Sequence, residues 1–132
     1  VLNGLAHPDV TFIPLQLVHG REQLTDQTAL NIADLGEQLD RDSGPFMDTA
    51  AIMSQLDLVI GSDTAVIHLA GALHVPTWVA LSIAPDWRWM LDRDDSPWYP
   101  SMKLFRQNRR GDWSDVIESM CDLLKTIQPR KC

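Results

Sequence analysis

The sequence has few basic residues, few cysteines and no long apolar run. No apolar segment approaches the ~20 residues needed to cross a bilayer, and the longest ones, Leu56–Ile60 and Ala65–Leu73, are separated by polar residues. We therefore expect a soluble protein with no membrane span. Lys and Arg number 11 against 18 Asp and Glu, which gives a net charge of −7. That sign disfavours duplex nucleic acid or an anionic membrane as the main partner.

The N-terminal segment lacks the basic and apolar regions of a signal peptide, because Val1–Val10 contains a His, a Pro and an Asp. The absence of an initial Met suggests a piece of a longer protein. Cys121 and Cys132 match neither a metal-ligand spacing nor a disulfide framework. These features predict a reduced, cytoplasmic setting.

What the sequence does contain is enough apolar material for one ordinary domain. The chain has 132 residues, of which 45% are hydrophobic and 22% charged, close to average globular composition. A chain of this length forms one domain with a sizeable core. We expect residues 1–132 to form that single domain.

Short apolar runs alternate with segments of helical periodicity. The expected strands are Val10–Gln16, Leu56–Ile60, Thr77–Leu81 and Lys103–Arg106, with Ile32–Leu35 as a possible very short one; the expected helices are Asp48–Met53, Ala65–Leu73 and Asp112–Ile127. Gly20–Leu30 is expected to be a loop or a short exposed helix.

This alternation predicts an α/β fold of the Rossmann-like type, with a parallel sheet between two helical layers. In such sheets ligands bind beyond the carboxyl ends of the strands. The expected site therefore follows Gln16, Ile60 and Leu81, and Gln16 could contact a nucleotide on the strength of that position.

The most informative segment is the turn from Ile60 to His68. Gly61 allows a tight turn, and the small Ser62, Thr64 and Ala65 let a ligand approach the backbone. The helix that follows would offer free amide hydrogens and a partial positive charge. His68 lies one helical turn after Thr64, on the same face. A diphosphate could bind there.

The same residues could instead have a purely structural role. Asp48-Thr49-Ala50 repeats Asp63-Thr64-Ala65, so Asp63 could be a helix cap whose carboxylate occupies the amides and repels phosphate. If the site binds a ligand, Asp63 would face sugar hydroxyls instead. His68 alone is more often a hydrogen-bonded, partly buried histidine than a catalytic group.

The motif L-D-L-V-I-x-x-D-T-A-x-x-H-L-A-G-A-L-x-x-P resembles the C-terminal lobe of the ADP-heptose glycosyltransferases, the heptosyltransferase-like branch of the GT-B fold. The stretch A-P-D-W-R-W-M-L-D-R-D-D-S-P-W-Y-P-S-M-K-L-F-R-Q is similar to a bacterial subgroup in which this lobe follows tetratricopeptide repeats. The resemblance runs from about Val10 to Ile127 and implies an N-terminally truncated lobe.

The resemblance implies that this lobe binds a nucleotide-diphosphate sugar as donor substrate, with no metal and no further cofactor. Asp63 would contact the donor sugar, the backbone of Thr64 and Ala65 would bind the diphosphate, and His68 would support the turn. Ser62, in the same turn, is a further expected substrate-binding residue. The family usually has Gly where this chain has Ala65, so a methyl group intrudes on the phosphate position. The repeat-linked subgroup also tends to carry Ala there.

The acceptor, which is unknown, and the general base would belong to an N-terminal lobe or repeat segment upstream. The glycine-containing strand that opens the family's lobe is missing too. We therefore expect no catalytic residue within this fragment and no activity from it alone. The alternative is a non-catalytic binding or scaffolding domain that keeps the fold without turnover.

Ser82–Ser101 is a 20-residue stretch with three prolines and three tryptophans, too long for a plain connector. Its aromatic residues could form a stacking wall for a base or sugar, or more simply anchor the loop on the core. Five arginines could complement phosphate, namely Arg88, Arg93, Arg106, Arg109 and Arg110, although the last two, beside Gly111, fit a solvated turn. The acidic residues of this stretch lack the spacing of a calcium loop.

Overall fold

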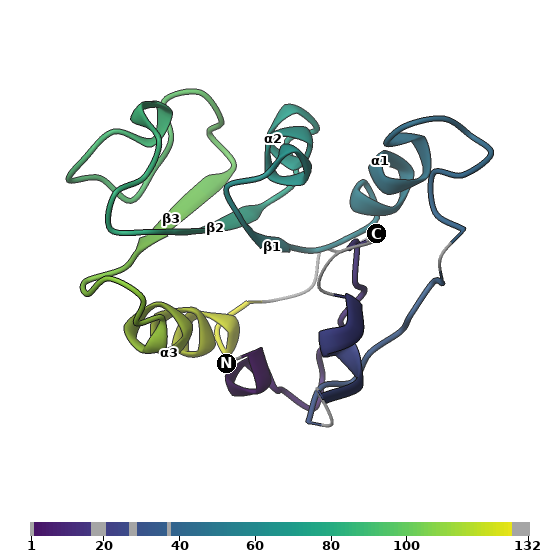
Figure 1. Ribbon diagram of the computed structural model, residues 1–132, viewed down its shortest axis with the longest axis horizontal. Coiled ribbons are helices and arrows are strands. Elements are labelled where there is room, and N and C mark those ends of the chain that lie inside the picture. Colours follow the sequence, from purple (N-terminus) through teal and green to yellow (C-terminus); the bar gives the residue numbers. More distant parts are fainter. Residues whose placement is uncertain (1, 17–20, 27–28, 37, 128–132) are drawn as a thin grey trace.

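The computed structural model describes residues 2–16, 21–26, 29–36 and 38–127 (Figure 1). Its core is a three-stranded, all-parallel sheet in the order β1-β2-β3. The strands are β1 (Val59–Ser62), β2 (Thr77–Leu81) and β3 (Met102–Arg106). The α/β class and the parallel sheet predicted from the sequence are confirmed.

Helices cover both faces of the sheet, as Figure 1 shows. Helices α1 (Met47–Met53) and α2 (Ala65–Ala72) lie on one face, and α3 (Ser114–Leu124) with the 3-10 turn η1 (Leu2–Leu5) lies on the other. Two more 3-10 turns, η2 (Arg21–Asp26) and η3 (Trp87–Trp89), lie in the connections. The predicted three-layer arrangement is therefore present. None of the helices in the described part of the chain has the length and apolar character needed to cross a membrane.

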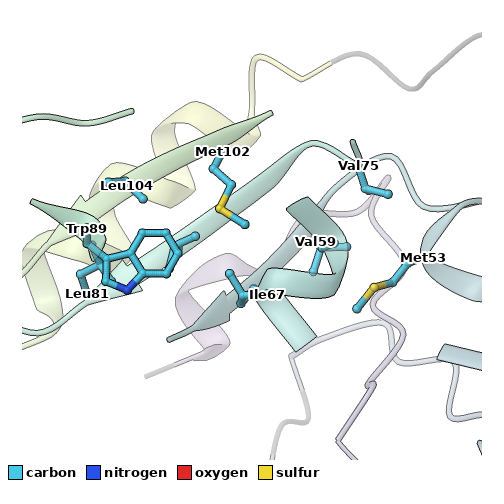
Figure 2. Packing of buried hydrophobic residues seen from close by; sticks show 10 residues of the cluster. Met53, Val59, Ile67, Val75, Leu81, Trp89, Met102 and Leu104 are labelled. Carbon is cyan, nitrogen blue, oxygen red and sulfur yellow. The ribbon is translucent and has the colours of Figure 1, made fainter. Parts of the chain in front are cut away.

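Strand alternation sends side chains into two separate hydrophobic clusters. The cluster beneath α2 contains Val59, Ile67, Val79, Leu81, Trp89, Met102 and Leu104, most of which are seen in Figure 2. The cluster beneath α3 contains Leu5, Trp78, Phe105, Val116, Met120 and Leu124. Adjacent residues of β2 thus point to opposite faces, as the period of a strand requires.

Strand β1 begins and ends later than the sequence predicts. Leu56, expected to open the strand, donates its amide to the carbonyl of Met53 and belongs to the turn that ends α1. Gly61 and Ser62 pair instead with Val79 and Ala80 of β2. The longer neighbouring strand offers these pairing partners, so the ladder continues past Ile60.

The strands predicted at Val10–Gln16 and Ile32–Leu35 are wrong. The two segments meet in a single parallel bridge between Phe12 and Ile32. Pro14 has no amide hydrogen to donate, so the ladder cannot extend past the bridge. Within the expected loop Gly20–Leu30, η2 confirms a short helical turn, while residues 20, 27 and 28 lie outside the described residues.

Helix α1 is capped by a residue that the sequence does not single out. The expected cap, Asp48, lies inside the helix, and its carboxylate accepts the amide of Asp40 (2.9 Å). The Asp40 carboxylate caps the helix by accepting the amides of Asp48 (2.7 Å) and Thr49 (3.1 Å) and the hydroxyl of Thr49. The role predicted for Asp48 is therefore filled by a residue eight positions earlier.

Candidate functional site

The candidate site is the turn between β1 and α2, at the carboxyl edge of the sheet. Ser62 ends the strand, Asp63 and Thr64 form the turn, and Ala65 begins the helix. All four residues are exposed. The structure therefore leaves this predicted segment open to solvent, and we call Ser62–Ala65 together with His68 the mouth.

Asp63 does not cap α2. The cap position belongs to Thr64, which has an extended conformation and whose side chain makes no capping hydrogen bond. The Oδ1 atom of Asp63 lies instead 3.4 Å from Nε2 of His68. The capping explanation is wrong for Asp63, whose carboxylate lies beside the imidazole of His68 instead.

His68 is enclosed by aromatic residues from the long loop. Its Nδ1 lies 3.2 Å from the hydroxyl of Tyr99, and its ring stacks on Trp89 with centroids 5.3 Å apart and an interplanar angle of 23°. The side chain is 29% exposed. The expectation of a hydrogen-bonded, partly buried histidine is confirmed, and its remaining nitrogen faces Asp63.

Gly61 is needed for packing and not for a turn. It lies inside β1, and its backbone is outside the left-handed region. A Cβ placed on it would come 2.8 Å from Cδ1 of Ile67 and 3.1 Å from Cγ1. The glycine therefore lets the first turn of α2 approach the strand closely, which fixes where the mouth lies.

Gln16 is not brought to the edge of the sheet by a strand, since that strand is absent. It is exposed, and its carbonyl accepts a hydrogen bond from Arg21 Nη1 (3.4 Å). Arg21 in turn binds the carboxylate of Asp34. The position that suggested a nucleotide contact for Gln16 is lost, and the contact itself stays a prediction.

The four aromatic residues of the Ser82–Ser101 loop divide into an inner and an outer pair. Trp89 is fully buried and Tyr99 is partly buried, and both contact His68. Trp87 and Trp98 are 72% and 52% exposed and meet edge to face with centroids 6.4 Å apart. The anchoring explanation is confirmed for the inner pair, whereas the outer pair presents its rings to solvent.

Most of the charged side chains of this loop neutralise one another. Arg88 pairs with Asp86, Arg93 with Asp95, and Lys103 with Asp94. At the next turn, the backbones of Arg109 and Asp112 form an isolated antiparallel β-bridge, and Gly111 adopts a φ of 80°. Within the described ranges, no three His, Cys, Asp or Glu side chains gather as a metal ion would require.

Arg106 is the charged residue whose position sequence reasoning does not foresee. Its Nη2 donates to the carbonyl of Trp89 (2.6 Å) and its Nε to the carbonyl of Arg93 (3.0 Å). Burial lowers the pKa of the guanidinium, which the nearby Asp92 carboxylate acts to raise. The available signal was an arginine at the end of the M-K-L-F-R run, on the same face of the expected strand as the apolar Met102 and Leu104.

One similar protein is Protein FlbA from Caulobacter vibrioides. It is 31% identical over 123 residues, which span 89% of this chain and 20% of FlbA. No protein-family model matches the chain, and no solved structure matches it. The chain thus spans about a fifth of the length of this curated relative.

Proposed function

We propose that this chain is the donor-binding lobe of a glycosyltransferase and that it holds a nucleotide-diphosphate sugar at the mouth. The observation that carries the proposal is the uncapped start of α2, from which Asp63 is turned aside toward His68. Free amides at a helix start attract a diphosphate through hydrogen bonds and the helix dipole. The resemblance of the Leu56–Pro76 motif to heptosyltransferase-like lobes supports the same function.

In this proposal the residues of the mouth have separate roles. The backbone of Ser62, Thr64 and Ala65 binds the diphosphate, and the methyl group of Ala65 limits how closely it approaches. Asp63 accepts hydrogen bonds from hydroxyls of the donor sugar, and His68 holds that carboxylate away from the phosphates. Stabilising the charge on the departing diphosphate would be the contribution of this lobe to transfer.

The acceptor site and the general base belong, in this proposal, to other parts of a longer protein. The match to one fifth of FlbA supports this division of labour, because it shows a related segment inside a longer chain. The fragment by itself is then expected to bind the donor without transferring the sugar. No metal ion and no cofactor take part.

Calorimetric titration of the 132-residue chain with ADP- and UDP-sugars tests the proposal. We expect binding of at least one class, and its loss in Asp63→Ala and His68→Ala. Asp42→Ala removes an exposed carboxylate elsewhere, and His74→Asn changes an exposed histidine at a φ of 57° to a residue that tolerates it. Equal affinity in the Asp63 and Asp42 variants would move the site away from the mouth.

A non-catalytic binding or scaffolding domain is the second candidate. Five of the nine exposed large hydrophobic side chains among the described residues lie in the Ser82–Ser101 loop: Ile83, Trp87, Met90, Leu91 and Trp98. Clustered exposed apolar residues are typical of interaction surfaces. A correctly folded chain that binds neither nucleotide sugar would favour this candidate.

A further inference from the structure

Arg106 closes a strained segment of the long loop. Its two hydrogen bonds reach the carbonyls of Trp89 and Arg93, on either side of residues 90–92. Within that segment Met90 and Asp92 have φ values of 53° and 56°. Residues other than glycine seldom adopt such angles, and they keep them only where the surroundings enforce them. Arg106 supplies that enforcement at both ends.

The guanidinium does this without a carboxylate in direct contact, although the Asp92 carboxylate lies near enough to favour its charge. Among the residues that the structure describes, no carboxylate forms an ion pair with Arg106, and its Nη1 is buried without a hydrogen-bond acceptor. Arg106 is partly buried, and leaving its buried Nη1 without an acceptor costs free energy. Arg106 bears this cost at the carboxyl end of β3, where its other two nitrogens hold the loop. An unpaired buried group of this kind calls for an explanation, and holding the loop in place supplies one.

Trp89 connects the loop to the mouth, because its backbone is bound by Arg106 and its ring stacks on His68. Arg106 lies on the same face of β3 as Met102 and Leu104, the face that packs beneath α2. Its hydrogen bond fixes the backbone of Trp89, whose buried ring is packed in the cluster of Figure 2 and stacks on His68. His68 in turn faces Asp63. Each step is a direct contact between neighbouring groups.

We propose that Arg106 is a positioning residue for the mouth: by anchoring the carbonyls of Trp89 and Arg93, it sets the ring plane of His68 and thereby the carboxylate of Asp63. The consequence for ligand affinity rests on the function proposed above, whereas the effect on His68 does not. Arginine suits this role because its planar fork donates in two fixed directions. A lysine has a single ammonium nitrogen, whereas Arg106 binds the two carbonyls with two different nitrogens. Lysine therefore cannot hold both carbonyls in the same geometry.

The proposal is tested with Arg106→Lys and Arg106→Gln. The matched control is Arg88→Lys, since Arg88 lies in the loop that Arg106 contacts but is 45% exposed and pairs with Asp86. The readouts are the NMR resonances of the His68 ring, which sense the stacked indole of Trp89, and the affinity for ADP. We expect both Arg106 variants to move the His68 resonances and to weaken ADP binding by about fivefold or more, and the control to do neither.

The retention of charge in Arg106→Lys separates geometry from electrostatics. If lysine leaves the His68 resonances and the ADP affinity as in the unaltered chain, the positioning role is overturned. If the unaltered chain binds no ADP- or UDP-sugar, the proposed function fails, and the His68 resonances still decide the role of Arg106.

A measurement on the unaltered chain covers the case in which the variants fail to fold. An anchored guanidinium rotates slowly and exchanges its Nε and Nη hydrogens slowly with water. We expect Arg106 to show both properties and Arg88 to show neither. Equal exchange rates for the two guanidinium groups would overturn the proposal.

Discussion

The carboxylate of Asp63 and the imidazole of His68 face one another across the first turn of α2, with Oδ1 3.4 Å from Nε2. A residue of the turn that precedes α2 and a residue within the helix therefore form a pair beside its start. Because the pair lies to one side, Asp63 does not cap the helix, and the side chain of the cap residue Thr64 makes no capping hydrogen bond either. The site is thus organised around a helix start that the side chain of its own cap residue, Thr64, does not cap.

The absence of a cap at α2 predicts a small stability effect at Asp63. Asp63→Ala should change the free energy of unfolding by no more than about 0.5 kcal/mol, since a partly exposed contact between a carboxylate and an imidazole contributes little. Asp40→Ala, which removes the cap of α1, should cost about 1 kcal/mol or more. Urea unfolding of both variants measures the difference. Equal losses would show that Asp63 caps its helix after all.

The pH dependence of stability should carry a signature of Asp40. Burial acts to raise the pKa of this carboxyl, but hydrogen bonds from the hydroxyl and amide of Thr49 and the amides of Asp48 and Phe46 lower it on balance. A carboxyl with a lowered pKa in the folded state stabilises the fold above its ordinary pKa of about 3.9. That contribution is lost as the pH falls through the lower, folded-state pKa.

We therefore expect the stability difference between the unaltered chain and Asp40→Asn to shrink as the pH falls from about 5 to about 2. Urea unfolding at a series of pH values measures it. Thr49→Val removes the hydroxyl that donates to Asp40, so in this background Asp40→Asn should cause a smaller pH-dependent loss of stability. Thr49→Ser keeps the hydroxyl and should leave that loss unchanged. A difference that stays constant down to pH 2 would contradict the assignment.

The close approach of Gly61 to Ile67 predicts a specific packing defect. Gly61→Ala should destabilise the chain by about 1–3 kcal/mol, because the added methyl group meets Cδ1 of Ile67. Ile67→Val removes that atom at a cost of about 0.5–1.5 kcal/mol by itself. The double variant should therefore lose less than the sum of the two. Additive losses would place the strain elsewhere.

Cys121 should react slowly with alkylating agents. Burial raises the pKa of its thiol, and its Sγ donates to the carbonyl of Gly4 (2.6 Å). Since the thiolate is the reactive form, iodoacetamide should modify it more slowly than glutathione at pH 7.5. Cys132 lies outside the described residues, so a Cys132→Ser background isolates the signal. A rate equal in native and denaturing buffer would contradict the prediction.

The sequence predicts the elements whose local and tertiary preferences agree. Thr77–Leu81 forms a strand over the predicted range because a run of apolar residues in the middle of a sheet is buried on both faces. Val10–Gln16 has a strand-like composition as well, but Pro14 and the lack of a long neighbouring strand leave it with one bridge. Composition alone does not distinguish the two cases.

The site shows the same limit. The spacing of Thr64 and His68 correctly places the histidine beside the mouth. The partners that orient it, Trp89 and Tyr99, come from a loop whose course depends on Arg106 and on two residues with positive φ. Similarly, Asp40 caps α1 across a turn. Contacts of this kind arise from how the chain closes on itself, and no periodicity encodes them.

The separation of the core into two clusters gives the molecule a pair of built-in optical reporters. Trp78 is packed against Phe105 beneath α3, and Trp89 is packed against His68 beneath α2. The fluorescence of each indole therefore reports on the packing of one face of the sheet. Fluorescence from variants that keep one or the other can reveal whether the two helical layers come apart together or one after the other.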